Sequence, residues 1–400
     1  MSVPKIAIYL IFVITGQSLC FANDEQKDIS IGKKITIESQ ILNEEREIWI
    51  HTPKNYDANE KYHVLYLLDG DSYFHMTTGI VNFLTSNSFM SETIVVGVLS
   101  TSRVKDYMPP IKDVPKSDRQ KFIRQEFPES GKANKFLSYL EKEIVPYIDK
   151  NYSTQPHRTL VGHSNAGVFA LYALVSNPNL FINYLVISPA GWWSEQEIDF
   201  NIQQLFKNNK DVKGNLYMTI ADEGGQMSSS ALRVAANLEQ HAPVSFTWTF
   251  VQMDKESHMS TLHPSIYDGL KNVYEEIKIK NIEDIARFSD VASVREFYQA
   301  LSKKYNYPVV IPSSLLTEFA FLQLKYGKSK EAITTFKLNL QQNPDWEFAH
   351  KNLGDGFMAN HQYSLAKSSY KKAVELGEKH NNKHIKFLKD KLKEAEGKVE

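Results

Sequence analysis

Five short apolar runs constrain the fold of this chain more than any other feature. Such runs are typical of parallel strands that helices cover on both faces. Helical patterns separate them, most clearly over residues 134–149, where apolar residues recur at three- and four-residue spacing. Two alternating patterns, at 35–42 and 46–51, predict paired strands ahead of the runs. We therefore predict an α/β fold, a mostly parallel sheet with helices on both faces, whose strands include residues 64–68, 94–98, 159–161, 184–187 and 216–220.

The C-terminal part carries a repeat of a different kind. Phe336 and Tyr370 occupy equivalent places 34 residues apart, and 34 residues is the period of the tetratricopeptide repeat, a pair of helices. We expect a small all-α domain of two such repeats and a capping helix. Because so few repeats bury little core, we expect them to pack on the α/β domain. The predicted parts are a signal peptide, the α/β domain, a helical connector and the repeats, at residues 1–22, 23–278, 279–312 and 313–400.

The N-terminus has the pattern of an export signal. Lys5 precedes an apolar run at 6–15, and Cys20 and Ala22 are small residues at the two positions that a signal peptidase reads. The run is too short for a permanent membrane span, so we favour cleavage after Ala22 over an uncleaved anchor. Cleavage removes the only cysteine, and the mature chain then forms no disulfide. The prediction is a periplasmic or secreted protein.

Composition gives no sign of a polyanionic partner. The chain has 46 basic and 47 acidic residues, which offers no electrostatic case for binding nucleic acid or an anionic membrane. It contains no P-loop and no dinucleotide fingerprint, and no His/carboxylate cluster has helical metal-ligand spacing. We therefore expect a small-molecule substrate, no cofactor and no metal.

A candidate nucleophile lies at the end of one predicted strand. Residues 160–172 run from an apolar pair through Gly162 and Ser164 into a helical pattern. This is the strand–turn–helix context of the G-x-S-x-G nucleophile elbow, in which a strained turn exposes the serine hydroxyl. Ala166 stands where the second glycine of the motif belongs. The extra methyl group would cost about 1–3 kcal/mol if helix and strand met too closely there.

A serine nucleophile needs a base, and histidine is the expected one. His258 follows the last predicted strand, 245–251, and precedes a helical pattern. In an α/β-hydrolase the base lies on the loop after the last strand, because the partners follow in the order serine, acid, histidine. His263 is the rival, and we expect it to cap the helix instead.

The acid of such a triad has several candidates. Asp222 and Glu223 end the predicted strand at 216–221, which is where this fold carries its acid. Asp254 and Glu256 are close to the histidine in sequence and could also reach the imidazole.

Several longer stretches of the sequence are typical of one protein family. They are VLYLLDG at 64–70, PYIDKNY at 146–152, GHS at 162–164, ISP at 187–189 with Trp192 and Trp193, and ESH at 256–258. On these stretches, spread over most of residues 40–275, the chain resembles the esterase family of α/β-hydrolases that includes esterase D-type S-formylglutathione hydrolases, siderophore esterases and mycolyltransferases. In arrangement it resembles exported members with a tetratricopeptide tail, which are similar to the siderophore-esterase branch.

The resemblance implies roles for five residues. Ser164 would be the nucleophile, His258 the general base and Glu223, in preference to Asp222, the acid, although some relatives work with a Ser–His dyad. The backbone N–H groups of Asp71 and Asn165 would hold the oxyanion.

Further residues of the matching phrases are candidates for substrate binding. Gly70 precedes Asp71, the residue expected to donate to the oxyanion. Trp192 and Trp193 would either line a site for an acyl or aromatic group or pack in the core and at its rim. Arg103 would meet an anionic substrate group or form a structural ion pair with Asp106.

Together these observations predict an exported serine hydrolase that cleaves carboxylic esters through an acyl-enzyme on Ser164. A siderophore-type, aryl or short acyl ester is the substrate that the resemblance implies. The alternatives are an acyltransferase with the same acyl-enzyme, and an inactive hydrolase whose repeats bind a protein. A homodimer or a protein partner could use the repeats. Residues 108–134, rich in charge and proline, would form a lid or specificity loop, or a plain surface excursion.

Overall fold

The computed structural model describes residues 29–399 except for short gaps. The predicted signal peptide lies outside the described residues, as does part of the connector and of the 108–134 segment. No described helix is long and apolar enough to cross a membrane. The gaps are residues 55, 59, 88, 111–116, 194–196, 275–284 and 306–308.

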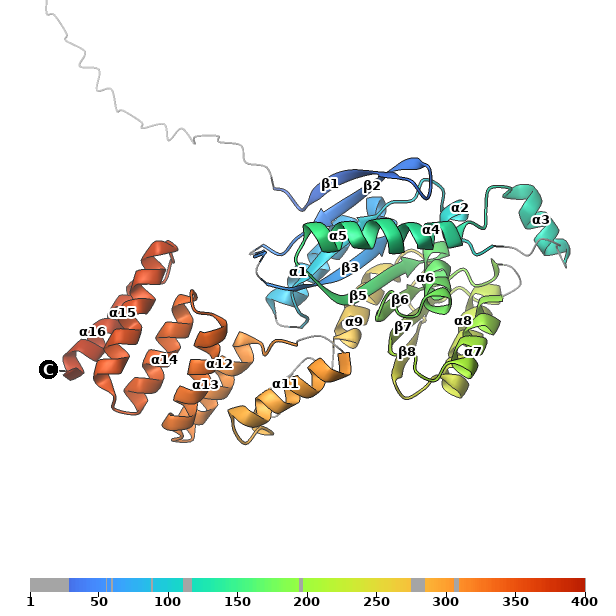
Figure 1. Cartoon of the computed structure of the whole chain (residues 1–400). Helices are drawn as coiled ribbons and strands as arrows, with labels where there is room; N and C mark the ends of the chain where they lie inside the picture. The colour runs from blue at the N-terminus through green and yellow to red at the C-terminus, as the bar shows by residue number, and fades with distance from the viewer. Residues whose placement is uncertain are drawn as a thin grey trace, which may run out of the picture. The chain divides into compact units, whose positions relative to one another are not determined.

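The α/β domain is built on an eight-stranded sheet with the order β1-β2-β4-β3-β5-β6-β7-β8 (Figure 1). Strands β1 and β2 are antiparallel to each other, β2 is antiparallel to β4, and all other pairs are parallel. The predicted mostly parallel sheet is therefore confirmed. Its strands are β1 (Lys33–Ser39), β2 (Glu44–His51), β3 (Tyr62–Leu68), β4 (Thr93–Val98), β5 (Thr154–His163), β6 (Asn183–Ile187), β7 (Gly214–Ala221) and β8 (Phe246–Met253).

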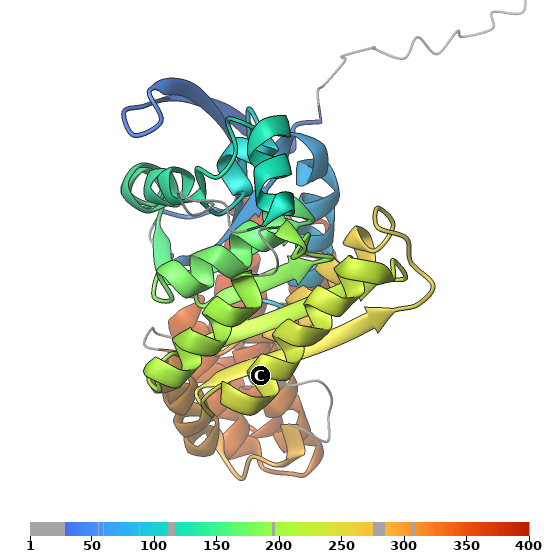
Figure 2. The same ribbon diagram turned by 90° about the vertical axis from the view of Figure 1, so that its right-hand side faces the viewer.

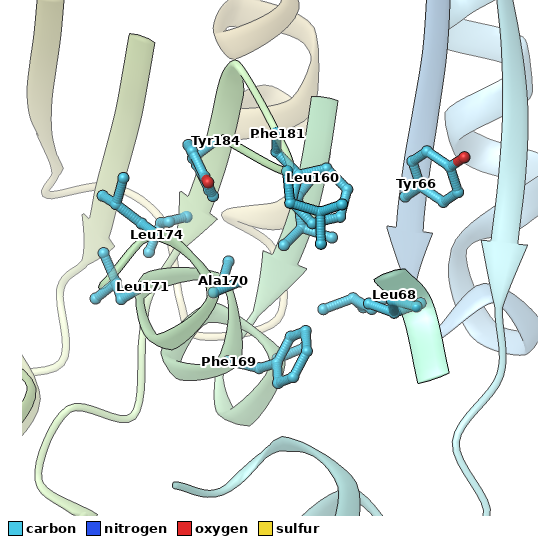
Figure 3. Packing of buried hydrophobic residues seen from close by; sticks show 14 of the residues in the cluster. Tyr66, Leu68, Leu160, Phe169, Ala170, Leu171, Leu174, Phe181 and Tyr184 are labelled. Atoms are coloured by element: carbon cyan, nitrogen blue, oxygen red, sulfur yellow. The ribbon is translucent and has the colours of Figure 1, made fainter. Parts of the chain in front are cut away.

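Both faces of the sheet are covered, which explains the continuous apolar runs. In β3, Val64, Tyr66 and Leu68 join one core while Leu65 and Leu67 join the other. The first core is filled from helices on one face, among them α6 (Asn165–Ser176), α7 (Glu197–Asn208) and α8 (Gly225–His241). Figure 3 shows Tyr66, Leu68 and side chains of α6 in this core, and Figure 2 shows α7 and α8 side by side. The second is filled from the other face. The first face carries α4 (Ala133–Tyr139), α5 (Val145–Asn151), α6 (Asn165–Ser176), α7 (Glu197–Asn208) and α8 (Gly225–His241), and the second α1 (Gly70–Ser86) and α9 (Leu262–Val273).

The helix predicted at 134–149 exists but is not a regular α-helix. A π-helical turn, Leu140–Ile144, separates α4 from α5. Pro146 lies just after this turn and has no N–H with which to continue the ordinary hydrogen-bond ladder. Leu140 and Ile144 are nevertheless fully buried, so the irregular turn still presents its apolar side to the core.

The C-terminal region consists of helices whose spacing matches the sequence repeat. Helices α14 (Glu347–Ala359) and α15 (Tyr363–Lys379) begin 34 residues after α12 (Ser313–Lys325) and α13 (Ser329–Gln342). Phe336 and Tyr370 are both buried, and Gly354 leaves room for the Tyr370 ring. The tetratricopeptide assignment, the domain boundaries and the docking of this region stay predictions. The helices are α11 (Val291–Tyr305), α12 (Ser313–Lys325), α13 (Ser329–Gln342), α14 (Glu347–Ala359), α15 (Tyr363–Lys379) and α16 (Ile385–Val399).

Candidate active site

Ser164 lies on a strained turn between β5 and α6. Its backbone has φ 61° and ψ −118°, which a residue with a Cβ rarely adopts. Neighbouring backbone over-determines this conformation: Ser164 N–H donates to Ile187 O at 2.9 Å, and Ser164 O accepts from Ala190 N at 3.1 Å. Strain held in this way is typical of functional turns. The hydroxyl stands at the carboxyl end of a central parallel strand.

Ala166 fits in the elbow without displacing it. The close approaches fall instead on Gly162, where a Cβ would lie 2.2 Å from Ala166 O, and on Gly167, where it would lie 3.1 Å from Pro189 Cα. Ala166 itself is fully buried in the first core. The departure from G-x-S-x-G therefore falls at a position where a methyl group is accommodated.

His258 and Glu223 meet at the carboxyl edge of the sheet. His258 lies on the loop between β8 and α9, and its Nδ1 is hydrogen-bonded to Oε1 of Glu223, which follows β7. The Glu223 side chain is 10% exposed, and its Oε2 is buried with no partner among the described residues. The carboxylate is therefore aimed at the imidazole, as a triad acid is.

The other acidic candidates do not take this place. Asp222 is exposed, and its backbone N–H donates to Glu256 O at 3.0 Å. In the described part of the loop, neither Asp254 nor Glu256 is hydrogen-bonded to the imidazole. His263 does not cap α9, because Thr261 occupies the cap position and His263 lies in the first helical turn.

His163 brings the histidine loop next to the elbow. Its Nε2 is 2.8 Å from His258 O, and the two rings are 4.5 Å apart between centroids. Burial, with a smaller contribution from His258, lowers the pKa of His163 to about 4. Among the described hydrogen bonds none joins Ser164 Oγ to the His258 ring, an arrangement common in unliganded enzymes.

The expected oxyanion donors lie in the first turns of two helices. Asp71 is the second residue of α1 and Asn165 the first of α6. N–H groups at these positions have no carbonyl partner within their own helix. Asp69, at the start of α1, has φ 53°. Gly70 approaches the next strand so closely that a Cβ would lie 2.7 Å from Gly97 Cα.

Arg103 ties the α1 turn to the elbow, and the predicted pair with Asp106 is wrong. Its Nε and Nη2 lie 2.9 and 3.0 Å from the two carboxylate oxygens of Asp69, and Nη2 also donates to His163 O at 3.1 Å. Burial raises the pKa of Asp69 in spite of this charge. Arg103 begins the short helix α2 (Arg103–Tyr107).

Asp106 has a different partner, which explains the error. Arg46 of β2 donates from Nη1 and Nη2 to its two oxygens at 2.7 and 3.0 Å, and both side chains are 1% exposed. Two buried, fully paired ions satisfy each other better than an exposed arginine would. No local spacing indicated Arg46, because it is 60 residues away.

The two tryptophans differ in their surroundings. Trp193 is buried, donates from Nε1 to Pro109 O at 3.2 Å and packs on Met108 and Ile123. It therefore anchors the 108–134 segment, where Ile123 lies in α3 (Asp118–Glu126). Trp192 is half-buried. Of the two, Trp192 is therefore the one that keeps exposed surface.

Sequence reasoning missed His163 and Asp69 as parts of the site. Both directly adjoin residues that it did select, Ser164 and Gly70, and that adjacency was the available signal. Their partners, Arg103 and the His258 carbonyl, are 34 to 95 residues distant. Among the described residues no group of three or more His, Cys, Asp and Glu is placed to hold a metal ion.

Comparison with known proteins identifies relatives of the α/β domain. The ferri-bacillibactin esterase BesA of Bacillus subtilis is 25% identical over 234 residues, which are 54% of this chain and 80% of that protein. The siderophore enterobactin esterase of Emericella nidulans is 29% identical over 163 residues, 36% of this chain and 51% of that protein.

Solved structures extend the likeness to the fold. The IroE-like serine hydrolase from Shewanella oneidensis is 25% identical, with a TM-score of 0.65, and the match covers 78% of this chain and 99% of that one. An uncharacterised protein from Capnocytophaga ochracea, 14% identical with a TM-score of 0.63, matches 92% of this chain and 99% of its own. That coverage includes C-terminal helices, so the fold of the tail is shared as well.

The family model described as "Putative esterase" matches residues 39–258, from the end of β1 to His258. This range is more than half of the chain and contains Ser164, Glu223 and His258. The chain therefore belongs to this esterase family and is a carboxylic ester hydrolase with an α/β-hydrolase fold.

Proposed function

We propose that the chain hydrolyses esters through an acyl-enzyme on Ser164. The observation that carries this proposal is the contact between His258 Nδ1 and the buried Glu223 carboxylate, on a loop held beside the strained serine. A carboxylate on Nδ1 leaves Nε2 as the base and stabilises the imidazolium that forms.

The proposed reaction moves one proton back and forth. His258 Nε2 takes the hydroxyl proton as Ser164 Oγ attacks the ester carbonyl, and then gives it to the departing alcohol oxygen. Water enters, loses a proton to the same nitrogen and cleaves the acyl-enzyme, which releases the acid and restores the Ser164 hydroxyl. Glu223 stays bonded to Nδ1 and takes no part in the proton transfer itself.

The negative charge of each tetrahedral intermediate needs fixed donors. We assign this role to the backbone N–H groups of Asp71 and Asn165, at the first turns of α1 and α6. Removal of one such donor costs roughly 3 kcal/mol of transition-state stabilisation. Because backbone groups do the work, the side chains at these two positions are free to vary.

We propose a siderophore-type ester, or another aryl or short acyl ester, as the substrate. Support comes from two relatives whose names describe siderophore esterases, one bacterial and one fungal. The half-buried Trp192 lies two residues after Ala190, whose N–H donates to Ser164 O, and an aromatic side chain at this place suits an aromatic acyl group.

The first experiment measures nitrophenol release from short- and medium-chain nitrophenyl esters. Wild type should turn over and be labelled by a fluorophosphonate, and Ser164→Ala should do neither. Ser86→Ala, at an exposed position on α1, is the control. An added alcohol that diverts the acyl group from water would favour the acyltransferase alternative. A folded wild type with neither turnover nor labelling contradicts the proposal and leaves the helical repeats as the functional part.

We also propose that the chain is exported and cleaved after Ala22. The support is the basic and apolar pattern of residues 5–15 and the small residues before the cleavage point. The test is N-terminal sequencing of the protein recovered outside the cytoplasm. A mature chain that begins at Asn23 is expected, and a chain that keeps Met1 contradicts the proposal.

A further inference from the structure

His163 makes hydrogen bonds to two separate segments of the site. Its ring nitrogen Nε2 lies 2.8 Å from the carbonyl oxygen of His258, on the loop after β8. Its own carbonyl oxygen accepts from Arg103 Nη2 at 3.1 Å, and Arg103 holds Asp69 beside the oxyanion turn. One residue, next to Ser164 in sequence, therefore links the elbow to both other parts of the site.

Only one tautomer of His163 allows the ring contact to be a hydrogen bond. A carbonyl oxygen only accepts, so the proton of the bond must be on Nε2 of His163. The ring is 3% exposed and faces the edge of Tyr73 as well as the His258 ring. Burial, and to a smaller extent the neighbouring His258 and Arg103, lower the pKa of His163, while the bond to the His258 carbonyl raises it. The ring is thus a neutral donor that adds no charge beside the base.

Besides the contact from His163, one described main-chain hydrogen bond ties the loop that carries His258 to another part of the sheet edge. Asp222 N–H, just after β7, donates to Glu256 O at 3.0 Å, two residues before His258. The internal bonds of the loop are local: Ser257 N donates to Ser260 Oγ at 2.9 Å, and Thr261 N donates to Ser257 O at 3.0 Å. Glu223 holds the His258 side chain. Among the described hydrogen bonds, the one from His163 Nε2 to His258 O joins the His258 main chain directly to the elbow.

A base that shuttles protons must stay at hydrogen-bonding distance from both Ser164 and the leaving group. An imidazole held only at Nδ1 can pivot about that contact. A second restraint on its main chain removes this freedom. We propose that His163 is a positioning residue that holds the His258 loop against the nucleophile elbow through its Nε2–H···O=C bond. This inference rests on the proposed function.

The experiment compares three substitutions of His163 in the full chain. His163→Gln carries an amide N–H near the place of Nε2, His163→Asn is polar but too short to reach, and His163→Leu has no donor. Steady-state hydrolysis of a nitrophenyl ester gives kcat and KM, fluorophosphonate labelling reports the reactivity of Ser164, and thermal unfolding reports stability.

His157→Leu is the matched control. His157 is also a buried histidine of β5, but it lies in the N-terminal half of the strand, six residues before His163, and its Nδ1 is 3.0 Å from His63 Nδ1. It should unfold at a lower temperature than wild type and keep the wild-type kcat. The control separates loss of a buried imidazole from loss of the contact to the His258 loop.

We expect kcat and the labelling rate of His163→Leu to fall between about 10- and 100-fold, with KM little changed, because a base displaced by a fraction of an ångström is a poor one. His163→Gln should keep most of the wild-type kcat and labelling rate, whereas His163→Asn should lose about as much as His163→Leu. If the Leu variant does not fold, the Gln and Asn variants still decide.

Three results would overturn the inference. They are wild-type kcat in the Leu or Asn variant, equal losses in Gln and Asn, and an equal loss of kcat in His157→Leu. If wild type itself neither turns over ester nor takes the label, the proposed function has failed and this inference with it. An active wild type beside an unimpaired His163 variant rejects this inference alone.

Discussion

Arg103 and Asp69 form a bidentate ion pair that joins helix α2 to the turn before helix α1. The guanidinium lies 2.9 and 3.0 Å from the two carboxylate oxygens and donates a third bond to His163 O. Asp69 is buried, whereas the Arg103 side chain is 42% exposed. The pair fixes the turn that carries the Asp71 N–H relative to the turn that carries Ser164.

Arg103→Lys should lower kcat about tenfold or more and destabilise the fold by about 1–3 kcal/mol. A lysine ammonium is a point charge and does not reproduce the planar fork that reaches both Asp69 oxygens and His163 O. Ester hydrolysis and urea unfolding of the variant measure the two effects.

Arg233→Lys is the control for this prediction. Arg233 pairs with Asp199 at 2.8 Å and is 40% exposed, so the two pairs are alike in burial, but this one joins α8 to α7. The control should lose stability and keep kcat. Equal losses of kcat in both variants would show that Arg103 has no special connection with the site.

Gly70→Ala should impair the oxyanion turn. The new Cβ would lie 2.7 Å from both Cα and C of Gly97, and because these are backbone atoms of a central strand, the turn must move instead. We expect a loss of about 1–3 kcal/mol in the free energy of unfolding and a lower kcat.

Gly79→Ala, in the same helix, provides the contrast to Gly70→Ala. A Cβ at Gly79 meets nothing within 4 Å. The free energy of unfolding of Gly79→Ala should therefore rise by about 0.5–1 kcal/mol, and its kcat should equal that of wild type. Urea unfolding and initial rates measure both variants. If Gly70→Ala kept the wild-type kcat, the assignment of the Asp71 N–H as an oxyanion donor would be contradicted.

Glu223→Gln should reduce kcat about 100- to 10,000-fold, as loss of the acid does in other serine hydrolases. The amide keeps the shape of the side chain but has no charge to stabilise the His258 imidazolium. Asp222→Asn, one residue earlier and exposed, should be neutral. Near-normal turnover of Glu223→Gln would mean that Ser164 and His258 work as a dyad.

Much of this fold could be predicted because local pattern and tertiary burial agree. Strands such as β3 and β4 are buried on both faces, so their sequences are apolar throughout. Ser164 was recognisable because Gly162 stands two residues before it, as the elbow requires, and a strand and a helix flank the turn. The second close approach of the backbones falls on Gly167, one residue later than the motif places its glycine.

The partners of charged residues could not be predicted in this way. Arg103 and Asp106 are three residues apart, yet they do not pair with each other. Arg103 pairs with Asp69 and Asp106 pairs with Arg46, and both partners lie on other segments. The choice depends on which side of α2 each residue faces, and a five-residue helix carries no periodic signal for that. The contact from His163 to a loop carbonyl has no side-chain signature at all, since any residue could supply the acceptor.

The last prediction concerns acid stability, because three histidines are buried. Burial lowers the pKa of His63 to about 3, of His163 to about 4, and of His157 well below its ordinary value of 6.5. Between about pH 4 and 6.5 the unfolded chain therefore binds protons at these sites and the folded chain does not. The free energy of unfolding must fall as the pH drops through this range.

At pH 5 each fully buried histidine should cost about 2 kcal/mol relative to pH 7. The raised pKa values of Asp69 and Glu92 act in the opposite direction, since the folded chain holds those protons more tightly. Urea unfolding of wild type and of His157→Gln at pH 7 and pH 5 separates the contributions, because the carboxyl groups are common to both. The variant should be less stable at pH 7 but lose about 2 kcal/mol less on acidification. An equal loss in the two proteins would mean that His157 is protonated in the folded state.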